Sequence, residues 1–486
     1  MTFSQGFVRT KIVCTLGPAS SSRETITRMI EAGMNVARMN FSHGTPDEHL
    51  ERMKLVRATS RVTGRPVAVL QDLPGPRLRI GRLKHGVVLL NSGSYFTLTS
   101  REVEGDSSVV SVNYPSLPSE VRVGDAIYLA DGSISLRVVE TAGTEVRCRV
   151  VVGGQLLAGK GVNIPNRPSK ISVLTEEDAK HLKFGLENGV DAVAISFVRK
   201  AEDIQYPKNI ARSEGSNAMV IAKIEKSEGV RNIRKIVEAA DGVMVARGDL
   251  GVEVALERVP LVQKEIIKRC NLAGKPVITA TQMLESMVEN PFPTRAEVAD
   301  VANAVFDGTD AVMLSEETAI GKHPVEAVRV LSRVARETEK ALPYREIMRQ
   351  RRELLHPIQE DAISLSASEL AFDIGAVAIV APTRTGSTAR RISKFRGPQP
   401  IIALTENEAV MRQLELSWGV HPVLWSKLER PTEIFRNAER AVLNLKLGKI
   451  GERIIVIAGD PSGPLGRTDM VKVQILGESL SQPRKS

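Results

Sequence analysis

Lys223 and Glu225 are separated by one residue and directly follow the apolar run 219–222. Alternate residues of a strand point to the same face, so these two side chains would lie about 6.6 Å apart along the chain. Asp249 follows the next apolar run. Carboxylates at adjacent strand ends make a hard, oxygen-rich site suited to Mg²⁺ or Mn²⁺. A surface ion pair is the alternative for Lys223 and Glu225, but the core-like run before them favours the end of a buried strand.

Polar or charged residues also close the other apolar segments. They are Arg38, Asn40 and Ser42; Asp72; Ser196; Arg247, Gly248 and Asp249; Thr281; and Ser315 and Glu317. One such residue is weak support for a site, because loops are generally polar, but a whole set converging on one rim is stronger. The glycines in 246–251 would let backbone N–H groups approach an anion closely. Taken alone, that segment is better explained by a plain turn between a strand and a helix.

The elements that must hold these residues alternate between strand and helix. Eight short, β-branched, wholly apolar runs stand at 11–15, 35–39, 67–71, 192–196, 220–224, 243–246, 277–280 and 311–314. Continuous apolar runs are typical of parallel strands covered on both faces. Helical patterns separate most of them, for example 22–32 and 176–188, and Thr294 with Glu297 forms a capping-box signature for a third. The pattern predicts a (β/α)₈ TIM barrel, whose active site lies at the carboxyl ends of the strands. A doubly wound sheet is the alternative.

Two further domains are predicted. Short runs at 87–90, 95–99, 126–129 and 146–152, punctuated by Gly, Asp and Ser, indicate an all-β insert over 75–172 that divides the barrel into 1–74 and 173–342. Because it follows a strand at its carboxyl end, it can act as a lid. A charged, irregular stretch at 344–357 is interpreted as a linker. Runs at 376–380, 401–405, 423–425, 454–458 and 471–476 then predict a C-terminal α/β domain within 343–486.

Composition excludes several classes of protein. The chain has 486 residues, 42% of them apolar and 25% charged, and no run suited to a signal peptide or a membrane span. Three scattered cysteines fit a reducing, cytoplasmic compartment. The net charge is +9, but the basic residues are interspersed with acidic ones and aromatic residues make up only 4% of the chain. No nucleic-acid partner is therefore expected. The phosphate-binding loop and the protein-kinase motifs are both absent, so any kinase activity must use another scaffold.

Five motifs carry a resemblance to a known family. They are residues 11–20 (KIVCTLGPAS), 34–44 (MNVARMNFSHG), 244–251 (MVARGDLG), 280–287 (ATQMLESM) and 310–319 (DAVMLSEETA). In sequence and in order, from about residue 9 to 476, the chain resembles the pyruvate kinase family. The resemblance implies transfer of phosphate from phosphoenolpyruvate to ADP, giving ATP as the last step of glycolysis. It also implies a divalent metal, a cytoplasmic homotetramer and no membrane partner. The first motif is expected to be structural, because its Gly17-Pro18 turn ends a strand.

The same resemblance implies roles for individual residues. Glu225 and Asp249 would hold the divalent metal, and Lys223 would steady the phosphoryl group in transfer. The backbone of Gly248 and Asp249 would bind the substrate carboxylate, and Thr281 would help to place the proton delivered to the enolate. Phosphate groups would bind Arg38 and Arg79, and Lys160 would join Arg79 in reaching the nucleotide from the lid. A monovalent-cation site would comprise Asn40, Ser42, Asp72 and the Leu73 carbonyl.

Arg77 predicts that K⁺ is not required. Relatives that need K⁺ carry Glu five positions after the aspartate that matches Asp72, whereas this chain carries Arg77 there. Leu73 also replaces a hydroxyl residue typical of those relatives. A fixed guanidinium could supply the charge that K⁺ otherwise provides, and would repel a second cation by about 1 kcal/mol or more. K⁺-independent relatives usually carry Lys at this position, so Arg is a departure; a solvent-facing Arg77 at the lid hinge is the alternative.

A second anion site is expected in the C-terminal domain. Its residues are Thr383, Arg384, Thr385, Gly386, Ser387 and Thr388, which follow a strand and open a helix carrying Arg390 and Arg391. Hydroxyls and N–H groups at a helix N-terminus form a phosphate cradle, so a phosphorylated regulator is predicted; an ordinary helix cap is the alternative. Two other functions remain open: a non-catalytic sensor of a phosphorylated metabolite, and a phosphoenolpyruvate-using barrel that forms a carbon–carbon bond. The sensor would have lost its metal ligands or lysine, and the second would lack the insert and the C-terminal domain.

Overall fold

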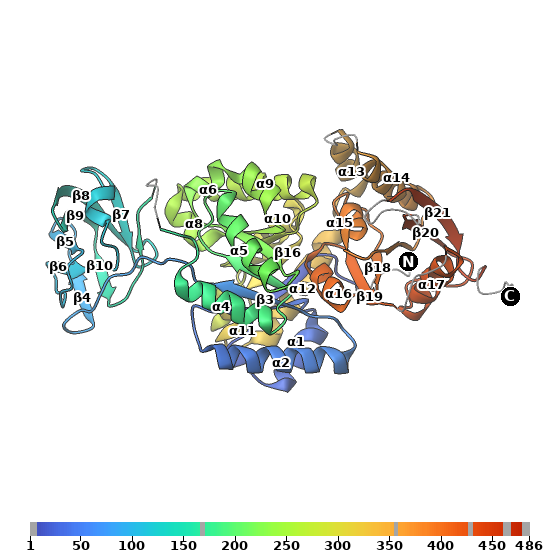
Figure 1. Cartoon of the computed structure of the whole chain (residues 1–486), viewed down its shortest axis with the longest axis horizontal. Coiled ribbons are helices and arrows are strands. Elements are labelled where there is room, and N and C mark those ends of the chain that lie inside the picture. Colours follow the sequence, from blue (N-terminus) through green and yellow to red (C-terminus); the bar gives the residue numbers. More distant parts are fainter. Residues whose placement is uncertain (1–6, 166–170, 354–357, 426–430, 460–467, 479–486) are drawn as a thin grey trace.

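A computed structural model describes residues 7–165, 171–353, 358–425, 431–459 and 468–478. The molecule is elongated and has three parts in a row (Figure 1). The β-rich insert lies at one end, the barrel in the middle and the C-terminal α/β domain at the other end. This arrangement leaves one end of the barrel facing the insert and another side packed on the C-terminal domain.

Eight parallel strands close into a barrel in the order β1-β16-β15-β14-β13-β12-β3-β2, which confirms the predicted (β/α)₈ fold. The strands are β1 (Lys11–Thr15), β2 (Val36–Asn40), β3 (Ala68–Leu73), β12 (Ala192–Ile195), β13 (Met219–Ile224), β14 (Gly242–Ala246), β15 (Val277–Ala280) and β16 (Ala311–Leu314). Pairing of Lys11–Cys14 with Ala311–Leu314 joins the first strand to the last. The alternative of an open, doubly wound sheet is therefore wrong.

Both faces of the strands are buried, which explains their unbroken apolar sequence. Leu70 and Met244 belong to a core inside the barrel, whereas their neighbours Val69 and Val245 pack with the surrounding helices. Those helices are α1 (Arg23–Ala32), α2 (Pro46–Thr63), α4 (Glu176–Glu187), α5 (Glu202–Ser213), α6 (Ser227–Arg231), α7 (Ile233–Ala239), α8 (Arg247–Glu253), α9 (Val259–Ala273), α10 (Arg295–Asp307), α11 (Glu316–Ala319) and α12 (Pro324–Lys340). Capping boxes at Thr175 and Thr294 begin α4 and α10, as the sequence predicts.

The insert contains two sheets and its own hydrophobic core. One sheet has the order β11-β7-β8-β9-β5-β6 and the other pairs β10 with β4. Their strands are β4 (Val87–Leu90), β5 (Tyr95–Thr99), β6 (Val109–Ser111), β7 (Ala126–Leu129), β8 (Ile134–Ala142), β9 (Glu145–Val152), β10 (Gly154–Leu157) and β11 (Val162–Asn163), and one helical turn, α3 (Leu117–Glu120), accompanies them. Fully buried Phe96, Leu98 and Leu136 are part of its core. An independent core lets the insert move as a unit relative to the barrel.

The C-terminal domain is an α/β unit whose sheet has the order β19-β18-β17-β20-β21. Its strands are β17 (Ala378–Pro382), β18 (Ile401–Thr405), β19 (Val420–Leu424), β20 (Arg453–Ala458) and β21 (Met470–Ile475), and only β21 runs antiparallel to its neighbour. Its helices include α13 (Tyr344–Glu353), α14 (Gln359–Asp373), α15 (Ser387–Ser393), α16 (Glu408–Gln413) and α17 (Pro431–Asn444).

The predicted linker at 344–357 is wrong over most of its length, because 344–353 form helix α13. Its charged residues pair along the helix: Arg349 contacts Glu346 at 2.8 Å and Glu353 at 3.1 Å. Met348 is 3% exposed and anchors the helix to the domain. Spacings of three and four residues place such pairs on one face of a helix, so the charge pattern indicates a helix rather than a linker. Residues 354–357 of the predicted linker lie outside the described residues.

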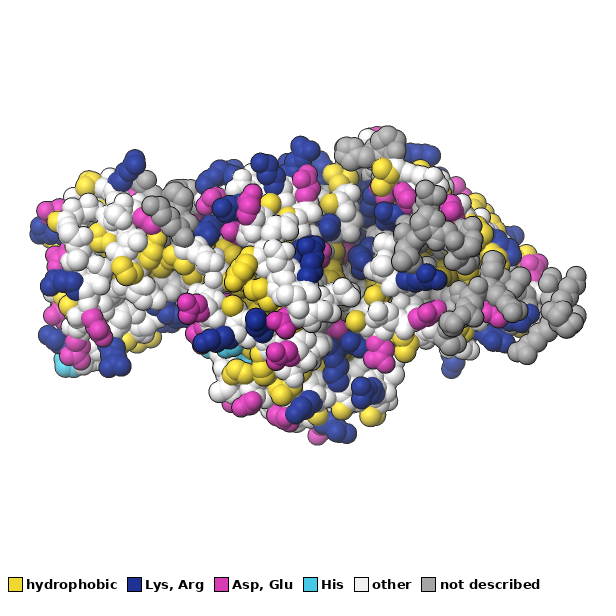
Figure 2. Space-filling model, in the orientation of Figure 1, with side chains coloured by type: hydrophobic (Ala, Val, Ile, Leu, Met, Phe, Trp, Pro, Cys, Tyr) yellow, Lys and Arg dark blue, Asp and Glu magenta, His cyan; other side chains and the backbone are white. Residues whose placement is uncertain are grey.

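The surface mixes charges of both signs. On the face shown in Figure 2, Lys and Arg side chains are interspersed with Asp and Glu side chains over all three domains. Within the described parts of the chain, no helix is long and apolar enough to span a membrane. Cys14, Cys148 and Cys270 are buried and unpaired.

Candidate active site

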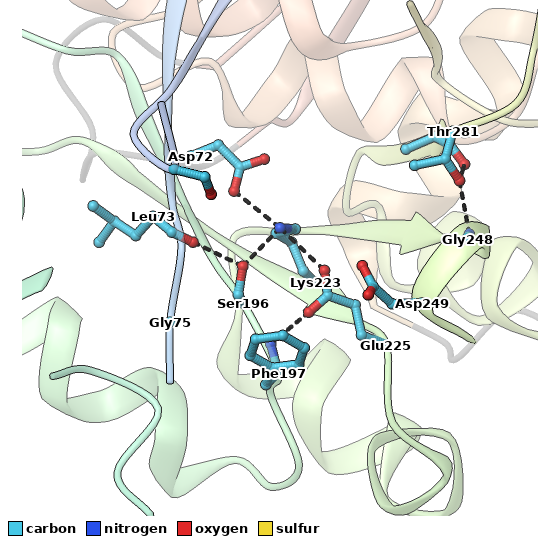
Figure 3. A network of polar contacts seen from close by, with 12 residues as sticks. Asp72, Leu73, Gly75, Ser196, Phe197, Lys223, Glu225, Gly248, Asp249 and Thr281 are labelled. Atoms are coloured by element: carbon cyan, nitrogen blue, oxygen red, sulfur yellow. Dashed lines mark hydrogen bonds and ion pairs between the residues drawn. The ribbon is translucent and has the colours of Figure 1, made fainter. Parts of the chain in front are cut away.

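Strand β13 delivers a buried lysine to the centre of the barrel rim. Lys223 Nζ lies 2.6 Å from Ser196 Oγ, 3.0 Å from Asp72 Oδ1 and 3.0 Å from Glu225 Oε1 (Figure 3). Ser196 Oγ in turn donates to the Leu73 carbonyl over 2.7 Å. Lys223 is 9% exposed, so the ammonium is held almost out of water by groups from three strands. This fixed cation is what stabilisation of a transferring phosphoryl group requires.

Asp72, at the end of β3, joins Lys223 to a second cation. Arg38 Nε donates to Asp72 Oδ2 over 2.7 Å, and another nitrogen of its guanidinium donates to Thr15 Oγ1 over 2.8 Å. Arg38 is 8% exposed and Asp72 1% exposed. The structure therefore brings the predicted Arg38, Asp72 and Lys223 together, with the two cations on opposite oxygens of one carboxylate.

The pKa values of the carboxyl groups in this network are shifted in opposite directions. Burial alone would raise the pKa of Asp72, but the adjacent Arg38 and Lys223 charges outweigh burial and lower it. Burial would likewise lower the pKa of Lys223, yet the Asp72 and Glu225 carboxylates raise it, so the lysine stays charged. Burial raises the pKa of Glu225; Lys223 opposes this rise and the nearby Asp249 charge adds to it. Glu225 is thus the carboxyl group that a further cation would stabilise most.

Glu225 and Asp249 fit a divalent metal. Glu225 has one oxygen on Lys223 and accepts the Phe197 N–H with the other over 2.8 Å. Asp249, in the first turn of α8, is close enough to raise the pKa of Glu225. Among the described residues there is no group of three or more His, Cys, Asp or Glu side chains that could hold a metal ion. Two carboxylates without a full protein cage suit Mg²⁺, which retains water and substrate oxygens as its other ligands.

Arg77 contacts the predicted metal ligand Asp249. A terminal nitrogen of Arg77 lies 3.4 Å from both Asp249 oxygens, and the two side chains are 38% and 23% exposed. Together they line a cleft between the barrel and the insert, with Gly161 on the insert side and Phe197 and Lys226 on the barrel side. Arg77 therefore contacts the candidate metal site while remaining exposed at the hinge of the insert.

A turn after β15 brings Thr281 to the beginning of α8. Gly248 N–H donates to Thr281 Oγ1 over 2.8 Å, and that hydroxyl donates to the Ala280 carbonyl over 2.6 Å (Figure 3). Thr281 has φ 70°, a conformation that β-branched residues rarely adopt. Arg247 stabilises this turn by donating to the Thr281 carbonyl over 2.7 Å, while its guanidinium pairs with Asp300 at 2.7 Å. Strain held by its surroundings is typical of a functional position.

Arg79 and Lys160 lie together in the insert. Arg79 donates to the Gly159 carbonyl over 2.9 Å, and the Lys160 carbonyl accepts the N–H of Ile80 over 3.0 Å. Neither is among the described residues that line the cleft, although the adjacent Gly161 is. The distance from Arg79 and Lys160 to the barrel rim therefore depends on how the insert is oriented.

The residues predicted to bind a monovalent cation cluster around the end of β2. Phe41 N–H donates to the Asp72 carbonyl over 3.0 Å, which ties the loop after Asn40 to β3. Asn40 Oδ1 accepts the Ser42 N–H over 3.2 Å. The Asp72 carboxylate already accepts from two cations, and the Leu73 carbonyl accepts from Ser196.

The predicted effector loop connects β17 to α15. Gly386, at φ 79°, donates its N–H to Thr383 Oγ1 over 3.0 Å, and Thr385 Oγ1 contacts Ser387 Oγ at 3.1 Å. Arg390 closes the loop by donating to the Thr385 carbonyl over 2.7 Å. The predicted helix carrying Arg390 is present, and the loop hydroxyls gather at its beginning. Arg384 is exposed and Thr388 Oγ1 lies 3.1 Å from Thr468 Oγ1.

One residue of the site is missed by the sequence analysis, and the structure shows the contacts of two others that it places at strand ends. Thr15 ends β1 and holds Arg38, so the strand-end rule that finds Asp72 applies to it equally. Glu317, 2% exposed, accepts the N–H groups of Leu284 over 3.1 Å and Ser315 over 2.7 Å. Glu317 therefore stabilises the turns after β15 and β16, and Ser315 contributes its N–H group to that contact.

Known proteins resemble this chain over nearly all of its length. Residues 7–328 match the family model "Pyruvate kinase, barrel domain" and residues 361–474 match "Pyruvate kinase, alpha/beta domain". A pyruvate kinase of Geobacillus stearothermophilus is 46% identical over 477 residues, 98% of this chain and 81% of that protein. One of Sporosarcina psychrophila is 45% identical over 478 residues, with the same coverage. The crystal structure of a pyruvate kinase from Cryptosporidium parvum superposes with a TM-score of 0.93 at 35% identity, covering 96% of both chains.

Proposed function

This chain belongs to the pyruvate kinase family and is a phosphotransferase, and we propose that it transfers the phosphoryl group of phosphoenolpyruvate to ADP, giving pyruvate and ATP. The observation that carries the proposal is the buried ammonium of Lys223, held by Asp72, Ser196 and Glu225 at the barrel rim. A transferring phosphoryl group spreads negative charge over its three equatorial oxygens, so catalysis relies on positioned positive charge. Arg38, on the other side of Asp72, supplies a second such charge.

Metal binding is proposed at Glu225 and Asp249. Both offer hard oxygens, and the raised pKa of Glu225 falls when a cation binds beside it. A bound Mg²⁺ or Mn²⁺ would neutralise charge on the phosphoryl oxygens. Arg77 must leave Asp249 for this to happen, because its guanidinium lies against both carboxylate oxygens.

The enolate end of the substrate is assigned to the beginning of α8. The N–H groups of Gly248 and Asp249 belong to its first turn, and such groups bind a carboxylate. Because Gly248 N–H donates to Thr281 Oγ1, a bound carboxylate shares or replaces that bond. The Thr281 hydroxyl is thereby brought next to the substrate, where it helps to place the proton that reaches the enolate carbon.

The nucleotide and the regulators bind to other parts of the chain. Arg79 and Lys160 bind the phosphates of ADP when the insert closes over the rim, which also excludes water. K⁺ is not required, since Arg77 supplies a fixed charge near the site. A phosphorylated metabolite regulates the enzyme through the loop 383–388, and the working form is a cytoplasmic homotetramer.

Pyruvate formation from phosphoenolpyruvate, ADP and Mg²⁺, followed by a coupled dehydrogenase assay, tests the activity. Replacing Lys223 with Met should lower kcat by about 10²-fold or more, the scale seen when one preorganised charge-stabilising donor is removed. Lys208→Met is the matched control, because Lys208 pairs with Asp241 at 2.7 Å, before β14 and away from the rim. An unmodified enzyme that makes no pyruvate would refute the function, and a Lys223→Met variant as active as the control would remove the lysine from the mechanism.

A further inference from the structure

A cavity of about 480 Å³ lies where the barrel meets the C-terminal domain, away from the rim described above. Helices α7 and α9 line it from the barrel, and α13, α14 and the Lys394–Phe395 turn line it from the C-terminal domain. Helix α13 lies at the top of the C-terminal domain in Figure 1, next to the barrel. A cavity of this size can hold a small metabolite.

Basic residues outnumber acidic ones in its lining. The lining bases are Arg234, Arg269, Arg351 and Lys394, and the lining acids are Glu238 and Asp361. Arg234 pairs with Glu238 at 3.3 Å, and Lys394 pairs with Asp361. Arg269 pairs at 2.6 Å with a carboxylate outside the cavity. Each acidic group is therefore matched by a base, and the remaining base is Arg351.

Arg351 has no counter-ion among the described residues. One of its terminal nitrogens, Nη1, is buried without a hydrogen-bond partner. The neighbouring Asp310 is engaged elsewhere, because it accepts Arg396 at 2.9 Å and the Trp418 N–H at 3.0 Å. Burial, with the repulsion of Arg396, lowers the pKa of Arg351, and the Asp310 charge opposes this effect. A guanidinium nevertheless keeps its proton, so a permanent charge stands here with an unmet donor.

An unmet buried donor is costly, and more so when it is charged. A bound oxyanion would remove that cost once the guanidinium turns into the cavity that Arg351 lines, since the planar group can donate two parallel bonds to neighbouring oxygens. Lys394 lines the same cavity, but its charge is already paired with Asp361. We propose that this junction cavity binds a phosphoryl group through Arg351, as free phosphate or as part of a small phosphorylated metabolite.

The site is distinct from the loop at 383–388. None of those six loop residues is among the described residues that line the cavity, and Arg351 is on a different helix. Because its walls come from two domains, an anion here would hold α13 and α9 in one relative position. Its binding is therefore expected to stabilise the contact between the barrel and the C-terminal domain.

Hydrogen exchange of the whole enzyme gives a readout local to this cavity, which separates it from phosphate bound at the rim. In 20 mM inorganic phosphate, against chloride at equal ionic strength, amides of 344–353 should exchange several-fold more slowly. Parallel samples contain ribose 5-phosphate or acetate in place of inorganic phosphate. Protection of these amides by the sugar phosphate alone identifies a metabolite site, and protection by inorganic phosphate as well shows that the free ion suffices. Equal protection by acetate would overturn the phosphoryl assignment.

Two variants and two controls complete the test. Arg351→Leu should abolish the protection, and Arg351→Lys, which keeps the charge but loses the fork, should weaken phosphate binding several-fold. Arg352→Leu is the matched control, because Arg352 is on the same helix, exposed, and paired with Glu369 at 3.3 Å. The double variant Thr385→Ala/Ser387→Ala should keep the protection. No protection in the unmodified enzyme, or protection that survives in both Arg351 variants, would refute the proposal.

Discussion

Replacing Arg77 with Glu should convert the enzyme from K⁺-independent to K⁺-dependent catalysis. The guanidinium lies 3.4 Å from both oxygens of Asp249, beside the network that contains Asp72. At contact range, about 4 Å, a K⁺ ion and a fixed unit charge interact by about 1 kcal/mol in water and about 4 kcal/mol at an effective dielectric constant of 20. Because the Arg77 side chain is 38% exposed, the lower end of that range applies.

Replacing the positive charge at position 77 with a negative one changes the interaction energy with K⁺ by twice this amount. A repulsion of about 1 kcal/mol towards a second cation becomes an attraction of similar size, and a change of about 2 kcal/mol corresponds to roughly 30-fold in K⁺ affinity. The same substitution removes the guanidinium that competes for Asp249, so Mn²⁺ should bind the variant more tightly in a direct titration without substrate.

The assay compares kcat in K⁺ with kcat in tetramethylammonium at matched ionic strength. Arg77→Lys should behave as the unmodified enzyme does, since it keeps a fixed cation. Arg137→Glu is the control for charge reversal, because Arg137 is exposed in the insert and donates to the Gly124 carbonyl over 2.9 Å. Tenfold or greater activation of the unmodified enzyme by K⁺ would refute the reasoning, and so would an Arg77→Glu variant indifferent to K⁺.

Three further predictions concern regulation, the turn after β15, and stability. Thr385→Ala combined with Ser387→Ala should abolish the response of the rate to phosphorylated metabolites, and an unchanged response to all of them in activity titrations would end that assignment. Arg247→Leu should lower kcat about tenfold or more with little change in metal affinity, because the Thr281 turn loses its support; Mn²⁺ titration separates the two effects. Burial and two nearby cations lower the pKa of His421 to about 4, below its unfolded value of about 6.5. The unfolded chain takes up this proton first, so stability should fall as pH drops from about 6.5 to about 4, and thermal midpoints should fall less in His421→Gln.

The sequence predicts the barrel well because each strand is buried on both faces. The runs at 11–15, 277–280 and 311–314 have the observed bounds of β1, β15 and β16. Prediction is poorer where apolar residues continue past a strand or where polar ones interrupt it. The run at 376–380 begins two residues before β17, and β19 begins at Val420 although His421 and Pro422 break its apolar pattern. The domain boundaries at 75, 172 and 343 stay predictions.

Helix α13 shows a different limit. Its mean hydropathy is low, and its apolar residues Tyr344, Ile347 and Met348 form only one short stripe at helical spacing, so the apolar signal for a helix is brief. The spacing of its opposite charges extends that signal, since Glu346, Arg349 and Glu353 pair along one face. The unmatched charge of Arg351 cannot be found in this way, because its isolation depends on Asp310 being engaged by a residue 86 positions away. Contacts between domains of this kind follow from the tertiary packing alone.

The residues of the candidate site also differ in whether the sequence predicts their contacts. Asp72 stands at the end of β3 and Lys223 with Glu225 at the end of β13, on either side of β12, and the closed barrel sets the distances between them within a buried network. Strand order therefore predicts that they meet, whatever the rest of the chain does. Arg79 and Lys160 belong to an insert with its own core, so their distance from Lys223 varies with the orientation of that domain. The rim residues belong to one closed sheet and the insert folds separately, which is why the sequence predicts how the rim residues meet but not where the insert residues lie relative to them.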